Sequence, residues 1–240
     1  MFHYLRVMHN SRPLIHQEHL LVEHFSKYAS DHKKAFVEKV LRNRTRHVTV
    51  VLEDIHQSQN ASAVVRTCEC LGIQDIHVIE NTARYEVNKG VLKGSYKWES
   101  LIRYRLPEAN NTETCYKHLR EAGYTIYATD PSEDNMPVSE IEVEKSKVAL
   151  VFGNEHLGLS TYALNHADYK VRIPMYGFTE SFNISVSAAL GLAALMPKLR
   201  TRWTDYSLTP DEMDVLRLQW YRKIVRKSDI IERQFLRTIR

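Results

Sequence analysis

The sequence predicts an α/β fold in which a mostly parallel β-sheet is covered by helices on both faces. Three observations support this prediction. Short segments rich in β-branched residues recur through the centre of the chain. Segments of helical periodicity separate them, as the crossovers between parallel strands require. The length of 240 residues suits one large α/β domain with terminal additions. We expect a core at residues 47–197, with helical extensions at residues 1–46 and 198–240.

The N-terminal extension is expected to form two helices. Apolar residues recur at helical spacing over residues 20–25 and again over residues 35–41. Ser30 lies between these segments and is a good helix N-cap. The extension ends in three basic residues, Arg42, Arg44 and Arg46.

The core is expected to alternate strands and helices. The predicted strands are residues 48–52, 76–79, 124–128, 148–152 and 170–173. The predicted helices are residues 61–71, 112–122 and 182–195. Strands that are separated by crossover helices form a parallel sheet, and helices then cover both of its faces.

The C-terminal extension follows Pro197 and a predicted loop at residues 201–207. Thr209 is a suitable N-cap, and Pro210 fits the first position of the helix that begins there. Acidic residues in the first turn favour the same start, because they complement the helix dipole. This helix carries a basic stretch at residues 222–227.

Charge is distributed unevenly along the chain. The net charge of +4 divides into +5 for residues 1–46, −6 for residues 47–197 and +5 for residues 198–240. Two basic ends on an acidic core suggest a polyanionic partner, because contacts with phosphates release counterions. Solvated basic helix faces explain the same pattern equally well from charge alone.

Missing motifs argue against several classes of site. The sequence has neither GxGxxG nor GxxxxGK[ST], the motifs of ordinary dinucleotide and P-loop sites. The three cysteines have no CxxC spacing, so we expect no metal site. No apolar run is long enough to span a bilayer, and no signal-peptide core is present, so we expect a cytoplasmic protein that does not associate with membranes.

The first of three informative segments begins at Asn60, where a helix cap is expected after the first strand. Arg66 lies about 200° around the predicted helix from both Val64 and Cys68. Since Val64 and Cys68 would face the core, Arg66 would point away from it. Taken alone, Asn60 and Arg66 are better explained as a routine cap and a solvent-exposed arginine than as site residues.

The second segment, Gly153-Asn154-Glu155, ends a very apolar strand. Polar loops at the carboxyl ends of parallel strands are where α/β sheets bind ligands. Gly153 would permit close approach to a ligand, and Glu155 would place a carboxylate at the rim. The alternative is a simple turn, with Glu155 in the first turn of a helix.

The third segment leaves a strand at Ile173-Pro174-Met175 and reaches a helix near Ser181 or Asn183, either of which could be the cap. The predicted helix is rich in alanine and glycine, which suggests close approach of another backbone. An ordinary buried helix of good propensity is the alternative.

In order and flanking structure, the three segments resemble motifs one, two and three of the SpoU/TrmH branch of the SPOUT RNA methyltransferases, over roughly residues 47–197. This resemblance implies a SPOUT-type α/β knot, which is a deep trefoil in the C-terminal part of the core. It also implies S-adenosylmethionine as cofactor, with S-adenosylhomocysteine as product. It further implies a homodimer whose site combines residues of both protomers.

The resemblance also implies roles for individual residues. Arg66 would be the principal catalytic residue and would promote deprotonation of a ribose 2′-hydroxyl, either directly or through an RNA phosphate. The second route is considered because an arginine side chain is a poor base in water. The other implied catalytic residues are Asn60, Glu155, Ser181 and Asn183. The implied cofactor-binding residues are Thr129, Gly153, Ile173, Met175 and Phe182, the last at a position where the family usually has leucine.

The implied reaction is 2′-O-methylation of a ribose in RNA, most similar to the tRNA-modifying members. We expect guanosine 18 in the tRNA D-loop as target, because relatives that act on ribosomal RNA commonly carry a longer N-terminal RNA-binding domain. Residues 94–98 and the Trp- and Arg-rich C-terminal helix also resemble the tRNA-modifying members. The alternatives are ribosomal RNA, another tRNA nucleotide, or a non-catalytic RNA-binding protein of the same fold. The expected RNA-binding residues are Arg42, Arg44, Arg46, Arg222, Lys223, Arg226 and Lys227.

Overall fold

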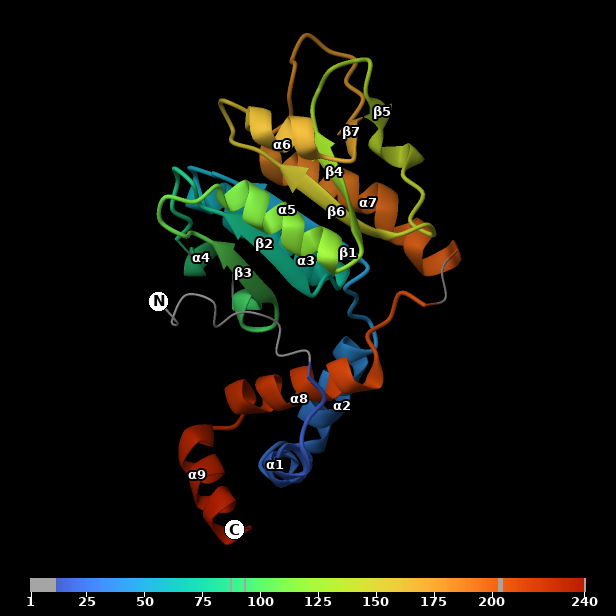
Figure 1. The fold of residues 1–240 in the computed structure, drawn as a ribbon. Helices are drawn as coiled ribbons and strands as arrows, with labels where there is room; N and C mark the ends of the chain where they lie inside the picture. Colours follow the sequence, from blue (N-terminus) through green and yellow to red (C-terminus); the bar gives the residue numbers. More distant parts are fainter. Residues whose placement is uncertain (1–11, 87, 93, 203–204, 240) are drawn as a thin grey trace. The chain divides into compact units, whose positions relative to one another are not determined.

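The computed structural model describes residues 12–239 with the exception of residues 87, 93, 203 and 204 (Figure 1). The described residues form two compact units. We call residues 45–206 the central unit. We call the described residues 12–44 and 207–239 the terminal unit.

The central unit is built on a seven-stranded sheet whose strand order is β3-β2-β1-β6-β4-β7-β5. All of the neighbouring strands are parallel, which confirms the predicted sheet type. The strands are β1 (Val48–Glu53), β2 (Asp75–Ile79), β3 (Ser100–Tyr104), β4 (Tyr124–Thr129), β5 (Met136–Pro137), β6 (Lys147–Phe152) and β7 (Tyr169–Arg172). Strands β3 and β5 were not predicted from the sequence, because β3 is only partly apolar and β5 has only two residues.

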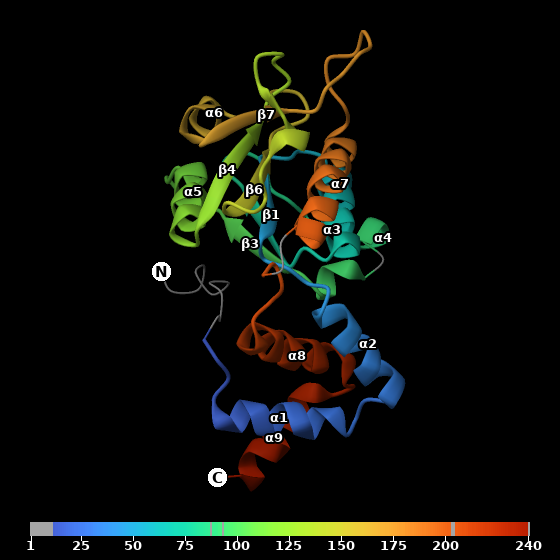
Figure 2. The ribbon, with the colours of Figure 1, turned by 90° about the vertical axis from the view of Figure 1, so that its right-hand side faces the viewer.

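Helices cover both faces of this sheet, as predicted (Figure 2). One face carries α3 (Ser58–Leu71) and α7 (Ile184–Arg202), and the other carries α5 (Asn111–Glu121) and α6 (Thr161–His166). Strand residues alternate between the two cores: Val50 packs in the α3/α7 core and Val51 in the α5/α6 core. Short helices occur at α4 (Lys89–Leu92), η1 (Ser95–Lys97) and η2 (Val138–Glu140).

Two helix boundaries differ from prediction by three residues or more. Helix α3 begins at Ser58 with Gln57 as its N-cap, so Asn60 lies in the first turn and is not the cap. Helix α7 continues through Pro197 to Arg202. A proline inside a helix leaves the carbonyl four residues earlier without its usual partner. Here both Pro197 and Ala193 are exposed, so water can reach that carbonyl.

The terminal unit consists of four helices, α1 (His16–Ser26), α2 (Asp31–Leu41), α8 (Pro210–Ile224) and α9 (Ser228–Thr238). The two terminal segments share one small core, which includes Phe25 and Tyr221. The predicted caps are confirmed, because Ser30 accepts a hydrogen bond from the Lys33 N–H and Thr209 forms a capping box.

An ion pair links α2 to α8 within the terminal unit. The Arg217 guanidinium contacts both carboxylate oxygens of Glu38, at 2.6 and 2.9 Å. These charge-assisted hydrogen bonds lower the pKa of the Glu38 carboxyl group. No helix among the described residues is both long and apolar enough to cross a membrane.

Candidate functional site

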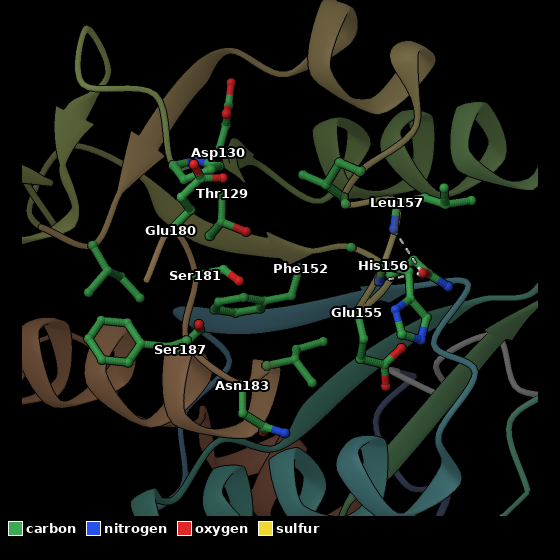
Figure 3. Close-up of a pocket in the computed structure, with 18 of the residues that line it drawn as sticks. Thr129, Asp130, Phe152, Glu155, His156, Leu157, Glu180, Ser181, Asn183 and Ser187 are labelled. Atoms are coloured by element: carbon green, nitrogen blue, oxygen red, sulfur yellow. Dashed lines mark hydrogen bonds between the residues drawn. The ribbon is translucent and has the colours of Figure 1, made fainter. Parts of the chain in front are cut away.

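A cavity of about 630 Å³ opens where the central strands of the sheet end. It lies at the carboxyl ends of β4, β6 and β7, the edge at which parallel α/β sheets bind ligands. Figure 3 shows Phe152 and Ser181 in the middle of the lining, with Thr129 on one side and Asn183 on the other. The predicted site residues that line it are Asn60, Thr129, Gly153, Glu155, Ile173, Met175, Ser181, Phe182 and Asn183.

The lining combines apolar and polar surfaces. Apolar walls come from buried residues at strand ends and at the start of α7, notably Phe152, Val171 and Ile184. The hydroxyl group of Thr129 donates a hydrogen bond to the Val151 carbonyl at 2.8 Å, which fixes its side chain at the end of β4. This composition is typical of sites for ligands that carry both a flat apolar ring and polar groups.

One side of the cavity is formed by residues 153–159, which we call the pocket loop; all seven of them line the cavity. The chain doubles back within this loop. Asn154 and Gly158 exchange two backbone hydrogen bonds of 2.9 Å each. The Asn154 side-chain oxygen accepts hydrogen bonds from the N–H groups of His156 and Leu157. These bonds fix the turn inside the loop.

This reversal of the chain explains why position 153 requires glycine. A Cβ at position 153 would lie 2.3 Å from the Gly158 carbonyl carbon and 2.3 Å from the Leu159 nitrogen. No side chain fits there. The glycine is therefore required by the protein's own backbone, and its expected approach to a ligand stays a prediction.

Three predicted residues, one from each motif, form a single hydrogen-bonded network beside the cavity. The Asn60 side-chain N–H donates to Glu155 Oε1 at 3.1 Å, and the Asn60 oxygen accepts from Asn183 Nδ2 at 3.2 Å. The Asn183 oxygen accepts from the N–H of Ser185 at 2.9 Å and so caps α7. Of the two caps considered for this helix, the structure shows Asn183 in that position.

The Glu155 carboxylate also accepts from the backbone at the start of α3. The N–H groups of His56 and Gln57 donate to its two oxygens at 3.3 and 3.4 Å. A carboxylate is favourable at a helix N-terminus, where N–H groups lack partners within the helix. Glu155 therefore joins the pocket loop to α3, a connection between two segments that the sequence pattern treats separately.

Arg66 lies on the exposed side of α3, as its position relative to Val64 and Cys68 predicted. Its Nη1 donates a hydrogen bond to the Val91 carbonyl at 3.3 Å. Within the described part of the chain, the residues that line the cavity do not include Arg66. The structure thus brings together nine of the ten predicted catalytic and cofactor residues and leaves Arg66 outside their cavity.

The surroundings of Arg66 are fixed by a buried tyrosine. The Tyr85 hydroxyl lies 3.0 Å from the hydroxyl of Ser62, which is one turn before Arg66 on α3. The Ser62 hydroxyl also accepts from the Asn88 N–H. Burial raises the pKa of the Tyr85 hydroxyl. The contacts of Ser62 with Tyr85 and Asn88 hold the chain before Val91 against α3.

Two of the predicted RNA-binding arginines make contacts inside the protein. Arg44 is 1% exposed, and its guanidinium lies 5.5 Å from the centre of the Trp220 ring within the terminal unit. Arg46 donates to the buried Asp75 carboxylate at 2.8 Å. The prediction for Arg44 is wrong because this side chain is buried, whereas Arg46 is partly exposed and its RNA-binding role stays a prediction. A cluster of basic residues in sequence does not reveal which members are used for internal pairing.

The remaining predicted basic residues are exposed and belong to the terminal unit. Arg222 forms a two-pronged ion pair with Glu232, at 2.9 and 2.6 Å. Lys227 has a left-handed backbone (φ 57°) at the turn between α8 and α9, which places Arg226 and Lys227 on a tight exposed corner. The other exposed members are Arg42 and Lys223.

Sequence reasoning missed several residues that line the cavity, among them Asp130, His156, Leu157 and Glu180. Asp130 and Glu180 each adjoin a predicted site residue, and they lie on the same side of the cavity as Thr129 in Figure 3. The rule that strand ends carry ligand sites would have found Asp130, which directly follows β4.

An all-parallel sheet with a mixed apolar and polar cavity at its carboxyl edge defines an α/β enzyme domain that binds a small ligand. More particularly, the chain belongs to the SpoU rRNA methylase family, whose model matches residues 47–193. The resemblance of the three motifs to the SpoU/TrmH branch is thereby confirmed.

Individual relatives agree with this assignment. The chain is 43% identical over 207 residues to a tRNA (guanosine(18)-2′-O)-methyltransferase of Borreliella burgdorferi, which covers 86% of this chain and 92% of that one. The crystal structure of the TrmH/SpoU tRNA modifying enzyme of A. aeolicus superposes with a TM-score of 0.72 at 26% identity and covers 82% of this chain and 98% of that one. An AdoMet-bound rRNA methyltransferase of Sinorhizobium meliloti shares the fold, with a TM-score of 0.56 at 20% identity over 68% of this chain and 59% of that one.

Proposed function

We propose that this protein transfers a methyl group from S-adenosylmethionine to a ribose 2′-oxygen of tRNA, and that guanosine 18 of the D-loop is the target. The observation that carries the reaction class is the network of Asn60, Glu155 and Asn183, which joins all three family motifs beside one cavity. The similarity to the Borreliella burgdorferi enzyme over most of both chains supports the substrate. We also propose a cytoplasmic location, because the proposed substrate is a tRNA of the cytoplasm.

The cavity has the chemistry that this cofactor needs. Phe152, Val171 and Ile184 provide apolar surface for an adenine ring, and Phe182, which is 43% exposed at the lining, provides an aromatic face. Polar groups at the strand ends are available to the ribose and amino-acid parts. When bound, S-adenosylmethionine supplies the methyl group. The residues that would hold it are Thr129, Gly153, Ile173, Met175 and Phe182.

Arg66 would act on the RNA side of the reaction. A guanidinium binds a phosphate through two parallel hydrogen bonds, which would fix the target nucleotide by its backbone. The 2′-hydroxyl proton would then pass to an oxygen of that phosphate, or to Arg66 after its guanidinium has first lost a proton. The exposed position of Arg66 suits contact with a large substrate. Asn60, Glu155, Ser181 and Asn183 would orient the ribose at the edge of the cavity.

A second copy of the chain would complete the site, because Arg66 lies outside the cavity of its own chain among the residues described. Helix α7 offers a surface for that copy. Val186 and Leu190 are 43% and 42% exposed, and Ala193 and Pro197 continue the same exposed stripe at helical spacing. We therefore propose a homodimer that packs on α7. The threading of a trefoil knot stays a prediction from the family resemblance.

Methyl transfer to defined RNAs tests the proposal. The purified protein is incubated with labelled S-adenosylmethionine and an unmodified tRNA transcript, and the methylated nucleotide is mapped by mass spectrometry of nuclease fragments. We expect a single 2′-O-methylguanosine at position 18, and no product with a transcript that has adenosine there. Methylation of ribosomal RNA alone would reject the tRNA assignment. Binding of tRNA without any affinity for the cofactor would instead indicate a non-catalytic RNA-binding protein.

A further inference from the structure

Glu53, the last residue of β1, is a buried carboxylate with a specific set of partners. It is 2% exposed. Its Oε1 accepts hydrogen bonds from the hydroxyl groups of Thr112 at 2.5 Å and Ser160 at 2.9 Å. Its Oε2 accepts from the Ser160 N–H at 2.8 Å. A buried charge is strongly unfavourable unless such bonds satisfy it, so these contacts are an essential part of the local fold.

Ser160 is the residue that ends the pocket loop. It directly follows Leu159, and its hydroxyl group accepts from the Ala163 N–H at 3.1 Å as the N-cap of α6. Two of its polar groups, the backbone N–H and the hydroxyl, are therefore bonded to Glu53. The exit of the pocket loop is tied to the end of β1 through this one carboxylate.

The entrance of the same loop is tied to the next residue of the chain. Asn154 donates from its side chain to the backbone carbonyl of Asp54 at 2.9 Å. Asp54 has a left-handed backbone (φ 51°), and its own carboxylate accepts from the N–H groups of Thr82 and Ala83. Two consecutive residues at the end of β1 thus hold both ends of the loop that lines one side of the cavity.

We propose that Glu53 is a positioning residue for cofactor binding, which acts through Ser160 to hold the pocket loop in its binding shape before the ligand arrives. Glu53 is not one of the described residues that line the cavity, so it acts without touching the ligand. The identity of the ligand rests on the function proposed above. Hydrogen bonds are directional, and a site held by them keeps its shape to within the small tolerance that tight binding needs.

Glu80 provides a matched control. It follows β2, the strand next to β1, and is 4% exposed. Its Oε1 accepts from the Tyr85 N–H at 2.8 Å and from Arg103 at 3.4 Å, and both partners lie outside the pocket loop. Loss of either glutamate disturbs a buried carboxylate site at the end of a central strand. Only loss of Glu53 should disturb the pocket loop.

The experiment compares Glu53→Leu, Glu53→Gln, Glu80→Leu and Thr112→Val in the full-length protein. Leucine keeps the approximate volume and removes both acceptors. Glutamine keeps one oxygen for the Ser160 N–H, while the hydroxyl groups of Ser160 and Thr112 can rotate to accept from its amide. Thr112→Val removes one bond to Glu53 that does not involve the loop. Binding of S-adenosylhomocysteine is measured by calorimetry, and hydrogen exchange is measured for peptides that cover residues 154–160.

We expect Glu53→Leu to weaken S-adenosylhomocysteine binding by about ten-fold or more, since displacement of a binding loop has effects of this order. Hydrogen exchange over residues 154–160 should be faster in the same variant. Glu53→Gln should restore most of the affinity. Glu80→Leu and Thr112→Val should bind the ligand as the unchanged protein does, even where their melting temperatures fall.

Unchanged affinity and unchanged exchange in folded Glu53→Leu would overturn the proposal, as would equal weakening by Glu80→Leu. If Glu53→Leu does not fold, Ser160→Ala replaces it, with faster exchange and weaker binding expected and their absence counting against the proposal. If the unchanged protein does not bind S-adenosylhomocysteine, the proposed function fails. The exchange comparison of the Glu53 and Glu80 variants still decides the positioning role in that case.

Discussion

The side-chain amide of Asn60 donates a hydrogen bond to the carboxylate of Glu155 over 3.1 Å, although the two residues lie 95 positions apart in the chain. The same amide accepts from Asn183, which caps α7. Asn60 therefore uses its donor toward one motif and its acceptor toward another. An aspartate or a leucine of similar size could not do both, which explains why an asparagine suits this position.

Asn60→Asp should abolish most of the activity. The change places a second carboxylate where Asn60 now donates to Glu155, and like charges at this distance repel. We expect the single-turnover rate of tRNA methylation to fall by about 100-fold or more, the scale seen when a positioned hydrogen-bond donor is lost. Gln59→Glu adds the same charge at an exposed neighbouring position of α3 and should change the rate little. Equal rates for the two variants would contradict the assigned role.

Arg66→Ala should greatly slow methyl transfer without weakening the binding of the cofactor. Arg66 is exposed and lies outside the described lining of the cavity, so its loss should leave S-adenosylhomocysteine affinity unchanged in calorimetry. The single-turnover rate should fall by about 100-fold or more, as for other groups that assist proton transfer. Arg120→Ala removes an exposed arginine from α5, on the opposite face of the sheet, and serves as control. Lost cofactor binding in Arg66→Ala would show that its role was misassigned.

Gly153→Ala should open the pocket loop. The added methyl group would lie 2.3 Å from backbone atoms of Gly158 and Leu159, so the loop must move. Overpacking of this kind costs about 1–3 kcal/mol of stability, and we expect a lower melting temperature together with weaker S-adenosylhomocysteine binding. Gly177→Ala meets nothing within 4 Å and should leave the melting temperature unchanged. A Gly153→Ala protein with normal affinity would mean that the loop tolerates the shift.

Replacement of Arg226 and Lys227 by glutamine should weaken tRNA binding in a salt-dependent way. Both side chains are exposed at the corner between α8 and α9. Each lost phosphate contact reduces the slope of log affinity against log salt by about one, so we expect a slope smaller by about two. Arg44→Met, which alters a buried arginine, should lower the melting temperature and keep the slope. An unchanged slope in the double variant would remove these residues from the RNA surface.

Leu190→Glu should convert the proposed dimer into a monomer. The side chain is 42% exposed in the apolar stripe of α7, and a carboxylate there would be buried without a partner on association. Light scattering should report half the mass of the unchanged protein. The rate of methyl transfer should fall as well, because Arg66 is proposed to act across the interface. Ile230→Glu changes a residue that is 41% exposed on α9 and is the control. A monomeric variant with full activity would contradict the shared site.

Much of the fold follows from the sequence because its signals are local. Five of the strands were predicted from their own composition, and the caps at Ser30 and Thr209 follow from the residues within one turn. The parallel arrangement follows from the spacing between strands. The start of α3 was misplaced because Asn60 is a favoured N-cap residue, whereas the helix begins after Gln57, whose side chain makes no cap hydrogen bond.

The candidate site was predicted in a different way. The order of three motifs resembled a known family, and nine residues named on that basis line one cavity. The structural roles of individual residues were harder to predict from the sequence. The sequence did not show that Gly153 must also accommodate the backbone of Gly158 and Leu159. Arg44 and Arg46 were expected at the surface, but each is used in an internal contact.

The sequence by itself determined the parallel α/β class, the family and nine of the residues that line the cavity. Only the tertiary structure decided how they are joined, as in the bonds of Asn60 to Glu155 and to Asn183, and in the hold of Glu53 on Ser160. Secondary structure depends on side chains within a few positions of one another, which a sequence displays directly. A hydrogen bond between residues 95 or 107 positions apart depends on the path of the whole chain between them.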